Sequence, residues 1–150
     1  MKVEDILKAK GRNVDTTPPG TTVALAAQEL TTRGIGALVV SSDGERVEGV
    51  FSERDIVRGL AHAGAALLRM RVSELMNRQV PICSPQDTIS HVMAEMTRTR
   101  NRHLPVVEGG RLCGIVSIGD VVKNRLEELE LETAVLRDAY IVHRSVRAVE

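Results

Sequence analysis

Aromatic residues are almost missing from this chain of 150 residues, which has one phenylalanine, one tyrosine and no tryptophan. Proteins that hold single-stranded nucleic acid stack its bases on aromatic rings, so this class has little support. Lysine plus arginine equals aspartate plus glutamate at 20 each, so no charge excess favours nucleic acid or a membrane surface. We therefore expect a small-molecule ligand held by aliphatic side chains, and neither a nucleic-acid nor a membrane partner.

Cysteine is also scarce. Cys83 and Cys113 lie far apart and have no histidine at ligand spacing, which leaves zinc and redox motifs unsupported. We expect two buried free thiols and no metal site. No run approaches the roughly 20 apolar residues of a membrane span, and Glu4 and Asp5 stand where a signal peptide would be apolar. These features predict a soluble, cytoplasmic protein.

Signatures of catalysis are missing too. The chain has no activated nucleophile, no carboxylate pair with an assigned role and no phosphate-binding loop. His62, His91 and His143 are scattered without catalytic or metal-ligand spacing. We therefore predict no enzymatic activity, no catalytic residues and no catalytic cofactor.

The chain does contain an internal repeat. Segment 14–23 aligns with segment 80–89 at an offset of 66 residues, and Pro19 matches Pro85. Apolar residues then recur at helical spacing over 23–30 and over 89–96. A capping residue precedes each of these helices, Thr21 or Thr22 in the first copy and Asp87 or Thr88 in the second.

Two strands follow in each copy. The apolar runs 37–40 and 103–107 are followed by turns at 43–44 and 109–110, and by second strands ending at 49–52 and 114–117. The offset has fallen to 65, so one residue is lost in the turn. A closing helix follows each hairpin, and a short leader helix, at 3–7 and at 72–76, precedes each copy.

The repeat predicts an α+β fold built from two β-α-β-β-α units. A three-stranded sheet of this size cannot bury its apolar face alone, so the two units should pack sheet to sheet around a pseudo-twofold axis. That packing would create two related clefts. The predicted boundaries are 1–68 for the first repeat, 69–128 for the second, and 129–150 for a long C-terminal helical extension.

One motif, Gly-x-x-Ser-x-x-Asp, occurs at the strand-to-helix junction of both copies. Its residues are Gly49, Ser52 and Asp55, and Gly114, Ser117 and Asp120. Ser-x-x-Asp before a helix is also a capping box, which would be purely structural. Its duplication favours a ligand, because a helix N-terminus and a serine hydroxyl suit an anion, and an aspartate can accept from ribose hydroxyls. The set suits a ribose phosphate.

All of these duplicated features together resemble the pair of cystathionine-β-synthase-type (CBS) domains, or Bateman module. The resemblance rests on the leader helix, the V-x-x-x-x-P strand, the Leu-Pro-Val-Val strand and the Gly-x-x-Ser-x-x-Asp junction, and covers about residues 1 to 130. It implies an adenine-nucleotide-binding regulatory module in which the aspartate holds the ribose. AMP is the ligand we favour, and ATP, ADP, NAD(H) and S-adenosylmethionine share its adenosine.

The resemblance also implies two clefts, each combining residues from both copies. One cleft consists of Ile115, Val116, Ser117 and Asp120 with Thr16, Ile35, Gly36 and Ala37. The other consists of Val50, Phe51, Ser52 and Asp55 with Ile82, Arg102, His103 and Leu104. We expect them to differ, because Thr16 offers a hydroxyl where Ile82 does not, whereas Arg102 and His103 stand where the family often meets phosphates. Arg54 could reach a phosphate or simply be solvated.

Beyond Asp120 the helical pattern continues as a heptad-like apolar stripe. Its members are Val122, Leu126, Leu129, Thr133, Leu136 and Tyr140, flanked by Glu127, Glu128, Glu130, Glu132 and Arg137. This helix could fold back on its own module or pair with a second copy. We favour a homodimer, since CBS pairs resemble one another in forming discs.

Two functions remain open from the sequence. The first is a nucleotide sensor that acts in trans on an unidentified protein partner, since the chain shows no effector domain. The alternative is a structural or scaffolding dimer without a ligand, in which the Ser-x-x-Asp motifs only cap helices. An enzyme acting on a nucleotide ranks last, because it lacks a candidate base or metal set.

Overall fold

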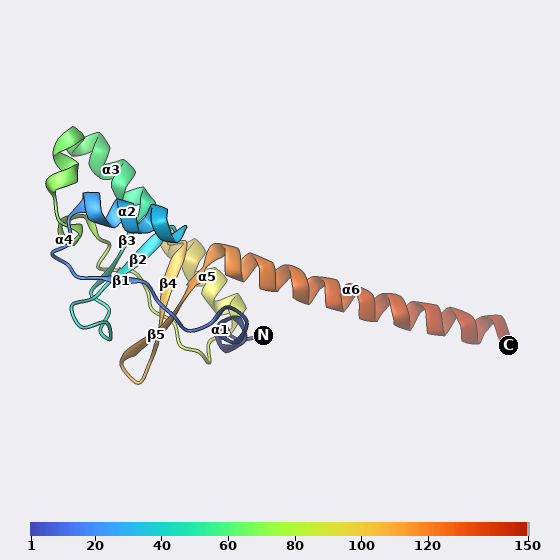
Figure 1. Cartoon of the computed structure of the whole chain (residues 1–150). Helices are drawn as coiled ribbons and strands as arrows, with labels where there is room; N and C mark the ends of the chain where they lie inside the picture. Colours follow the sequence, from blue (N-terminus) through green and yellow to red (C-terminus); the bar gives the residue numbers. More distant parts are fainter. Residues whose placement is uncertain (150) are drawn as a thin grey trace.

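The computed structural model describes residues 1–149, with side chains through residue 143. Two small α+β halves lie side by side, and one long helix projects from them (Figure 1). The elements in chain order are α1 (Val3–Lys10), β1 (Thr16–Thr17), α2 (Val23–Arg33), β2 (Ala37–Val40), β3 (Gly49–Ser52), α3 (Glu53–Ala63), the 3-10 helix η1 (Gly64–Arg69), α4 (Val72–Leu75), α5 (Ile89–Thr99), β4 (His103–Glu108), β5 (Arg111–Ser117) and α6 (Ile118–Val149).

Strand pairing confirms the internal repeat and the one-residue deletion. In the first hairpin Ala37 pairs with Ser52, and in the second His103 pairs with Ser117. The first strands of the two hairpins are thus offset by 66 residues and the second strands by 65, as the sequence predicts. Both hairpins therefore present their serine at the same point, where the second strand enters the closing helix α3 or α6.

The helix caps also follow the repeat. The hydroxyl of Thr22 accepts from the backbone N–H of Leu25 at 3.3 Å, and that of Thr88 accepts from His91 at 3.1 Å. Of the two candidates in each copy, the second is therefore the cap. A threonine hydroxyl in this position satisfies one of the helix's unpaired donors, which fixes where α2 and α5 begin.

The two leader helices exchange places between the halves. The N–H of Val3 donates to the carbonyl of Asp87, and in the equivalent bond the N–H of Val72 donates to Thr21, both at 2.9 Å. Likewise Lys2 bridges Thr88 while Arg71 bridges Thr22. Each leader helix thus makes the same contact with the opposite repeat, as a pseudo-twofold axis requires.

This exchange divides the hydrophobic core into two clusters of mixed origin. Val3, Ile6 and Leu7 of α1 are buried against α5, β4 and β5 of the second repeat. Leu67 of η1, Val72 of α4 and Met76 are buried against α2, β2 and β3 of the first. Packing therefore crosses the proposed boundary between residues 68 and 69, which remains a division of the sequence rather than of the core.

The second sheet departs from the expected three strands. The first sheet has the order β1-β2-β3, whereas the second pairs only β4 with β5. The third strand is reduced to a single parallel bridge between Cys83 and Val106. In the first sheet Val39 donates to Asp15, but the equivalent position is Pro105, which has no N–H to donate. Proline therefore removes the bond that would have extended the strand.

Both cysteines are free, as predicted. Cys83 is buried as expected, but Cys113 is only half-buried and departs from the expectation of two buried thiols. Burial, reinforced by the nearby Asp87 carboxylate, raises the pKa of the Cys83 thiol to about 12, which leaves it protonated and unreactive. Within the described residues, no helix is long and apolar enough to cross a membrane.

Candidate functional site

The duplicated Ser-x-x-Asp motif forms a capping box in the first repeat. The N–H of Ser52 donates to Asp55 Oδ2 at 2.8 Å, and the Ser52 hydroxyl lies 3.3 Å from the same oxygen. The other oxygen, Asp55 Oδ1, accepts from Arg58 Nη2 at 2.7 Å. Asp55 is only 4% exposed, and Arg58 is the group that covers it from the solvent side.

The second repeat builds the same box with a different cationic partner. The N–H of Ser117 donates to Asp120 Oδ2 at 2.9 Å, and the N–H of Asp120 donates to the Ser117 hydroxyl at 3.1 Å. Lys10, at the end of α1, donates to the same Oδ2 at 2.6 Å. The exchanged leader helix thus places a lysine on the carboxylate that was expected to hold a ribose.

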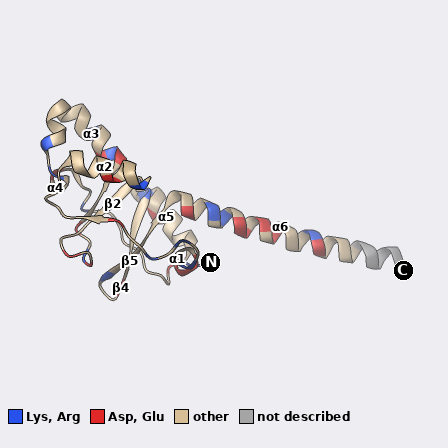
Figure 2. Ribbon diagram, in the orientation of Figure 1, with Lys and Arg blue, Asp and Glu red and all other residues tan. Residues whose placement is uncertain are grey.

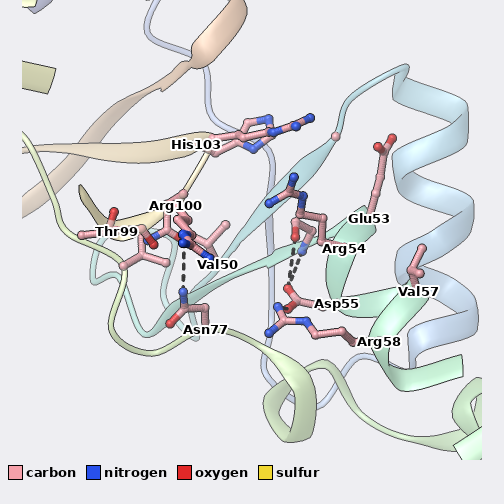
Figure 3. Close-up of a pocket in the computed structure, with 15 residues that line it drawn as sticks. Val50, Glu53, Arg54, Asp55, Val57, Arg58, Asn77, Thr99, Arg100 and His103 are labelled. Carbon is pink, nitrogen blue, oxygen red and sulfur yellow. Dashed lines mark hydrogen bonds and ion pairs between the residues drawn. The ribbon is translucent and has the colours of Figure 1, made fainter. Parts of the chain in front are cut away.

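A cavity of about 610 Å³ lies where the first repeat's box meets the second repeat. From the first repeat it is lined by Gly36, Val50, Ser52, Glu53, Arg54, Asp55, Val57 and Arg58. From the second it is lined by Asn77, Val80, Thr99, Arg100, Asn101, Arg102 and His103. Figure 3 shows Asp55 and Arg58 side by side at the start of α3, with His103 entering from β4.

Most residues predicted for the second cleft lie around this cavity: Val50, Ser52, Arg54, Asp55, Arg102 and His103. Phe51 and Leu104 do not, because their side chains are fully buried in the two core clusters. Ile82 is 56% exposed and lines a separate depression with Val80 and Val107. At Phe51 and Leu104 only backbone groups remain available to a ligand.

The residues predicted for the first cleft are more dispersed. Ala37 and Val116 are buried, while Thr16, Ile35 and Ile115 are half-buried, and Ile35 packs against the first core cluster. Gly36 lines the other cavity instead, where a Cβ atom on it would lie 3.3 Å from His103 Cε1. Ser117 and Asp120 remain together in their box beneath Lys10.

Charge in the cavity is predominantly positive. Four arginines line it, at positions 54, 58, 100 and 102, against the two acids Glu53 and Asp55, which gives a balance of +2 with histidine neutral. Burial raises the pKa of Asp55 even though Ser52 and Arg58 oppose the shift. Burial, with the charge of Lys10, lowers the pKa of His103. An anionic ligand would therefore find both charge and hydrogen-bond donors here.

Asp120 has the opposite electrostatic setting to Asp55. Burial alone would raise its pKa, but the hydrogen bonds from Lys10 and Ser117 and the lysine charge outweigh burial, so the pKa of Asp120 is lowered. The carboxylate of Asp120 is therefore stabilised in its charged form by a partner within the chain. A ribose there would have to compete with an ammonium group.

Two cationic residues of the cavity were missed by sequence reasoning. Arg58 lies one helical turn beyond Asp55, a spacing typical of an ordinary exposed pair on a helix. Arg100 follows α5 at the position equivalent to Gly34 and shares its left-handed backbone, with φ of 57° against 63°. A non-glycine residue in this region is uncommon and often marks a functional site. The mismatch between Gly34 and Arg100 was visible in the aligned repeats.

Among residues 1–143, no group of three or more histidine, cysteine, aspartate or glutamate side chains could hold a metal ion. The residues around the cavity are instead mainly hydrogen-bond donors and cations, with two acids and a partly apolar wall. This arrangement can bind an anionic organic molecule.

Comparison with known proteins identifies the repeat. The family model of the CBS domain matches residues 3–62 and again residues 72–127. The chain is 31% identical over 150 residues to the mitochondrial CBS domain-containing protein CBSX3 of Arabidopsis thaliana, covering 92% of this chain and 73% of that protein.

Solved structures share the fold. The CBS-domain containing protein ATU1752 from Agrobacterium tumefaciens has a TM-score of 0.79 and 47% identity, covering 83% of this chain and 92% of that one. The CBS domain pair of protein MJ0100, solved in complex with 5′-methylthioadenosine and S-adenosyl-L-methionine, has a TM-score of 0.73 at 24% identity, covering 82% of this chain and 98% of that one.

Proposed function

The chain belongs to the CBS domain family and carries two copies of its domain, and on this premise we propose that it is a regulatory module that binds a phosphate-bearing adenine nucleotide. Stand-alone CBS-domain pairs form a regulatory rather than a catalytic family. The proposed site is the cavity between the box of Ser52 and Asp55 and the second repeat. AMP is the simplest ligand with the required groups, and ADP, ATP and NAD(H) also contain them.

The observation that carries this proposal is the convergence of both repeats on one cavity. Asp55 supplies a carboxylate for ribose hydroxyls, the start of α3 supplies helix N–H groups, and Arg102 and His103 enter from the opposite half. A cavity of about 610 Å³ is of the size that encloses small organic ligands. Val50, Val57 and Val80 offer aliphatic surface for a planar base, in keeping with the scarcity of aromatic residues.

The charge of the cavity supports a phosphate. Four arginines against two acids favour an anion over the positively charged sulfonium of S-adenosylmethionine. The related MJ0100 pair was solved with two adenosine compounds, 5′-methylthioadenosine and S-adenosyl-L-methionine. From the MJ0100 pair we carry over only the adenosine part of the ligand. The four arginines of the cavity are our reason for proposing that the ligand also has phosphate groups.

Regulation would operate through a protein partner. A ligand that contacts both repeats favours conformations in which they are held together, and a partner that distinguishes those conformations would respond to nucleotide concentration. The scaffolding alternative uses the same boxes only as helix caps, which they are. The two functions differ in whether nucleotides stabilise the fold.

Thermal unfolding with AMP, ADP, ATP, NAD and S-adenosylmethionine at millimolar concentration tests the proposal. A ligand at about 100 times its dissociation constant should stabilise the fold by about 2.7 kcal/mol, which corresponds to about 5–10 °C for a domain of this size. We expect phosphate-bearing ligands to raise the midpoint and Asp55→Asn to abolish most of the rise.

The matched control is Asp120→Asn, which alters the equivalent capping box outside the cavity. This variant is expected to keep the nucleotide-dependent rise, even if its midpoint without ligand falls. If no nucleotide shifts the wild-type midpoint, the motifs are helix caps only and the scaffolding function takes precedence. If Asp120→Asn abolishes the rise and Asp55→Asn does not, the ligand binds in the other cleft.

A further inference from the structure

Helix α6 extends well past the body of the molecule. It has 32 residues, which corresponds to about 48 Å. The Oε1 atom of Glu128 lies 3.3 Å from the amino group of Met1, and this ion pair joins α6 to the body. From residue 129 to residue 143 every side chain is exposed, and Figure 1 shows the helix running away from both halves. It therefore does not fold back on its own module.

One face of this projecting helix is apolar. Leu126, Leu129, Leu136 and Tyr140 are 54, 41, 71 and 64% exposed and, with Thr133, follow the alternating spacing of three and four residues that pairs helices. These five residues are called the seam below. A groove of about 310 Å³ runs along it and has Glu130 and Arg137 among its lining residues. A single helix with such a face is marginal in water and is stabilised by burying it.

We propose that α6 of a second copy of this chain lies antiparallel on the seam. In the register that places Leu129 against the partner's Tyr140, Thr133 meets the partner's Leu136. Glu130 then faces the partner's Arg137, and the twofold axis makes this ion pair twice. The groove thus contains both members of a self-complementary charge pair beside an apolar stripe.

The residues that line the groove favour the antiparallel direction, because it pairs Glu130 with the partner's Arg137. Four glutamates lie within residues 127–132, and Figure 2 shows red segments on the half of α6 nearer the body. A parallel pair would place Glu130 and Arg137 against the partner's Arg125 and the partner's Glu132, which do not line the groove, and would bring the two clusters of acids to the same end. In the antiparallel pair, the four glutamates of each helix lie toward the part of the partner helix that contains Arg137. The two bodies then lie at opposite ends of the pair.

Charge reversal in the full-length protein tests the pairing. Sedimentation equilibrium should find a dimer for the wild type, and E130R or R137E alone should raise its dissociation constant by about tenfold or more, since both symmetric ion pairs become repulsive. The double variant E130R/R137E re-creates both pairs with the charges exchanged and should return to within about threefold of the wild type. An equimolar mixture of the two single variants should form the heterodimer in preference to either homodimer.

The double variant separates the possible orientations. In a parallel pair Glu130 would face the partner's Arg125 and Arg137 would face the partner's Glu132, so exchanging the charges would leave two repulsive contacts on each side. A double variant as weak as the single variants would therefore overturn the antiparallel arrangement. A monomeric wild type, or single variants that dimerise like the wild type, would overturn the seam itself. The midpoint of thermal unfolding of each variant, measured at a concentration where it is monomeric, controls for folding.

Discussion

At the scale of single residues, the most informative contact is the one between Asp55 and Arg58. Asp55 is 4% exposed and both its oxygens are occupied, one by Ser52 and the other by Arg58. Arg58 itself is 69% exposed in its side chain and lines the cavity. A ribose can reach the carboxylate only if the guanidinium moves away, and a phosphate in the same cavity offers it another partner.

This arrangement predicts that a phosphate is needed for tight binding. We expect AMP to bind more tightly than adenosine, and Arg58→Met to reduce this preference about tenfold, because adenosine no longer displaces an ion pair and AMP loses a cation. Isothermal titration with both ligands measures the ratio. Arg54→Met is the control, since it removes a cavity arginine without releasing Asp55 and should weaken AMP while leaving adenosine unchanged. Equal losses for both ligands in Arg58→Met would contradict the role given to Arg58.

At the scale of elements, the end of helix α5 differs from the end of α2. Both helices terminate in a left-handed residue, which is Gly34 after α2 and Arg100 after α5. Glycine adopts this conformation without steric penalty, whereas a side chain is strained by about 1 kcal/mol or more. Arg100 lines the cavity, so the strained residue is one whose cationic side chain can contact an anionic ligand.

Replacing Arg100 should therefore separate stability from binding. Arg100→Gly is expected to raise the free energy of unfolding by about 1 kcal/mol and to weaken nucleotide binding by about tenfold. Urea unfolding and titration with AMP measure the two effects. The reciprocal variant Gly34→Arg should lose about 1 kcal/mol and bind normally, because Gly34 lies outside the cavity lining. Destabilisation by Arg100→Gly would show that the arginine side chain stabilises the helix end.

At the scale of the whole molecule, the exchange of leader helices makes the two repeats interdependent. Leu7 of α1 lies directly against the second repeat, where a Cβ atom on Gly114 would be 2.6 Å from its Cδ2. In the first repeat, a Cβ atom on the equivalent Gly49 would be 2.9 Å from Met76 Sδ. Each half thus covers the core of the other. The motif has glycine at this position because a leader segment packs directly against it and leaves no room for a side chain.

Separating the repeats should consequently unfold both. Fragments 1–68 and 69–150, divided at the boundary proposed from the sequence, are each expected to lack cooperative unfolding, since each leaves apolar surface of its core uncovered. Mixing them should restore one cooperative transition. Circular dichroism during heating measures both states. The intact chain is the control, and a cooperative transition in either isolated fragment would show that a repeat is an independent domain.

Much of this molecule follows from the sequence because its determinants are local. The helix starts near residues 22 and 88, the hairpins, the residue lost in the second copy before Gly114, and the long helix after Ser117 depend on spacing along the chain. Each of these signals occurs in both repeats, so the two copies support each other. The family and the fold class could therefore be predicted without coordinates. The assignment of Asp55, Arg102 and His103 to one cleft came with the family resemblance.

Tertiary structure alone decided the features that depend on distant pairs. Nothing near Asp120 in the sequence indicates that Lys10 covers it, because the two residues meet only through the exchanged α1. The lost third strand depends on which residue Pro105 faces, and the cationic cavity depends on Arg58 and Arg100 arriving from different halves. Local patterns specify elements, whereas contacts between elements are set by how the two cores share their leader helices, and it is these contacts that make the two clefts unequal.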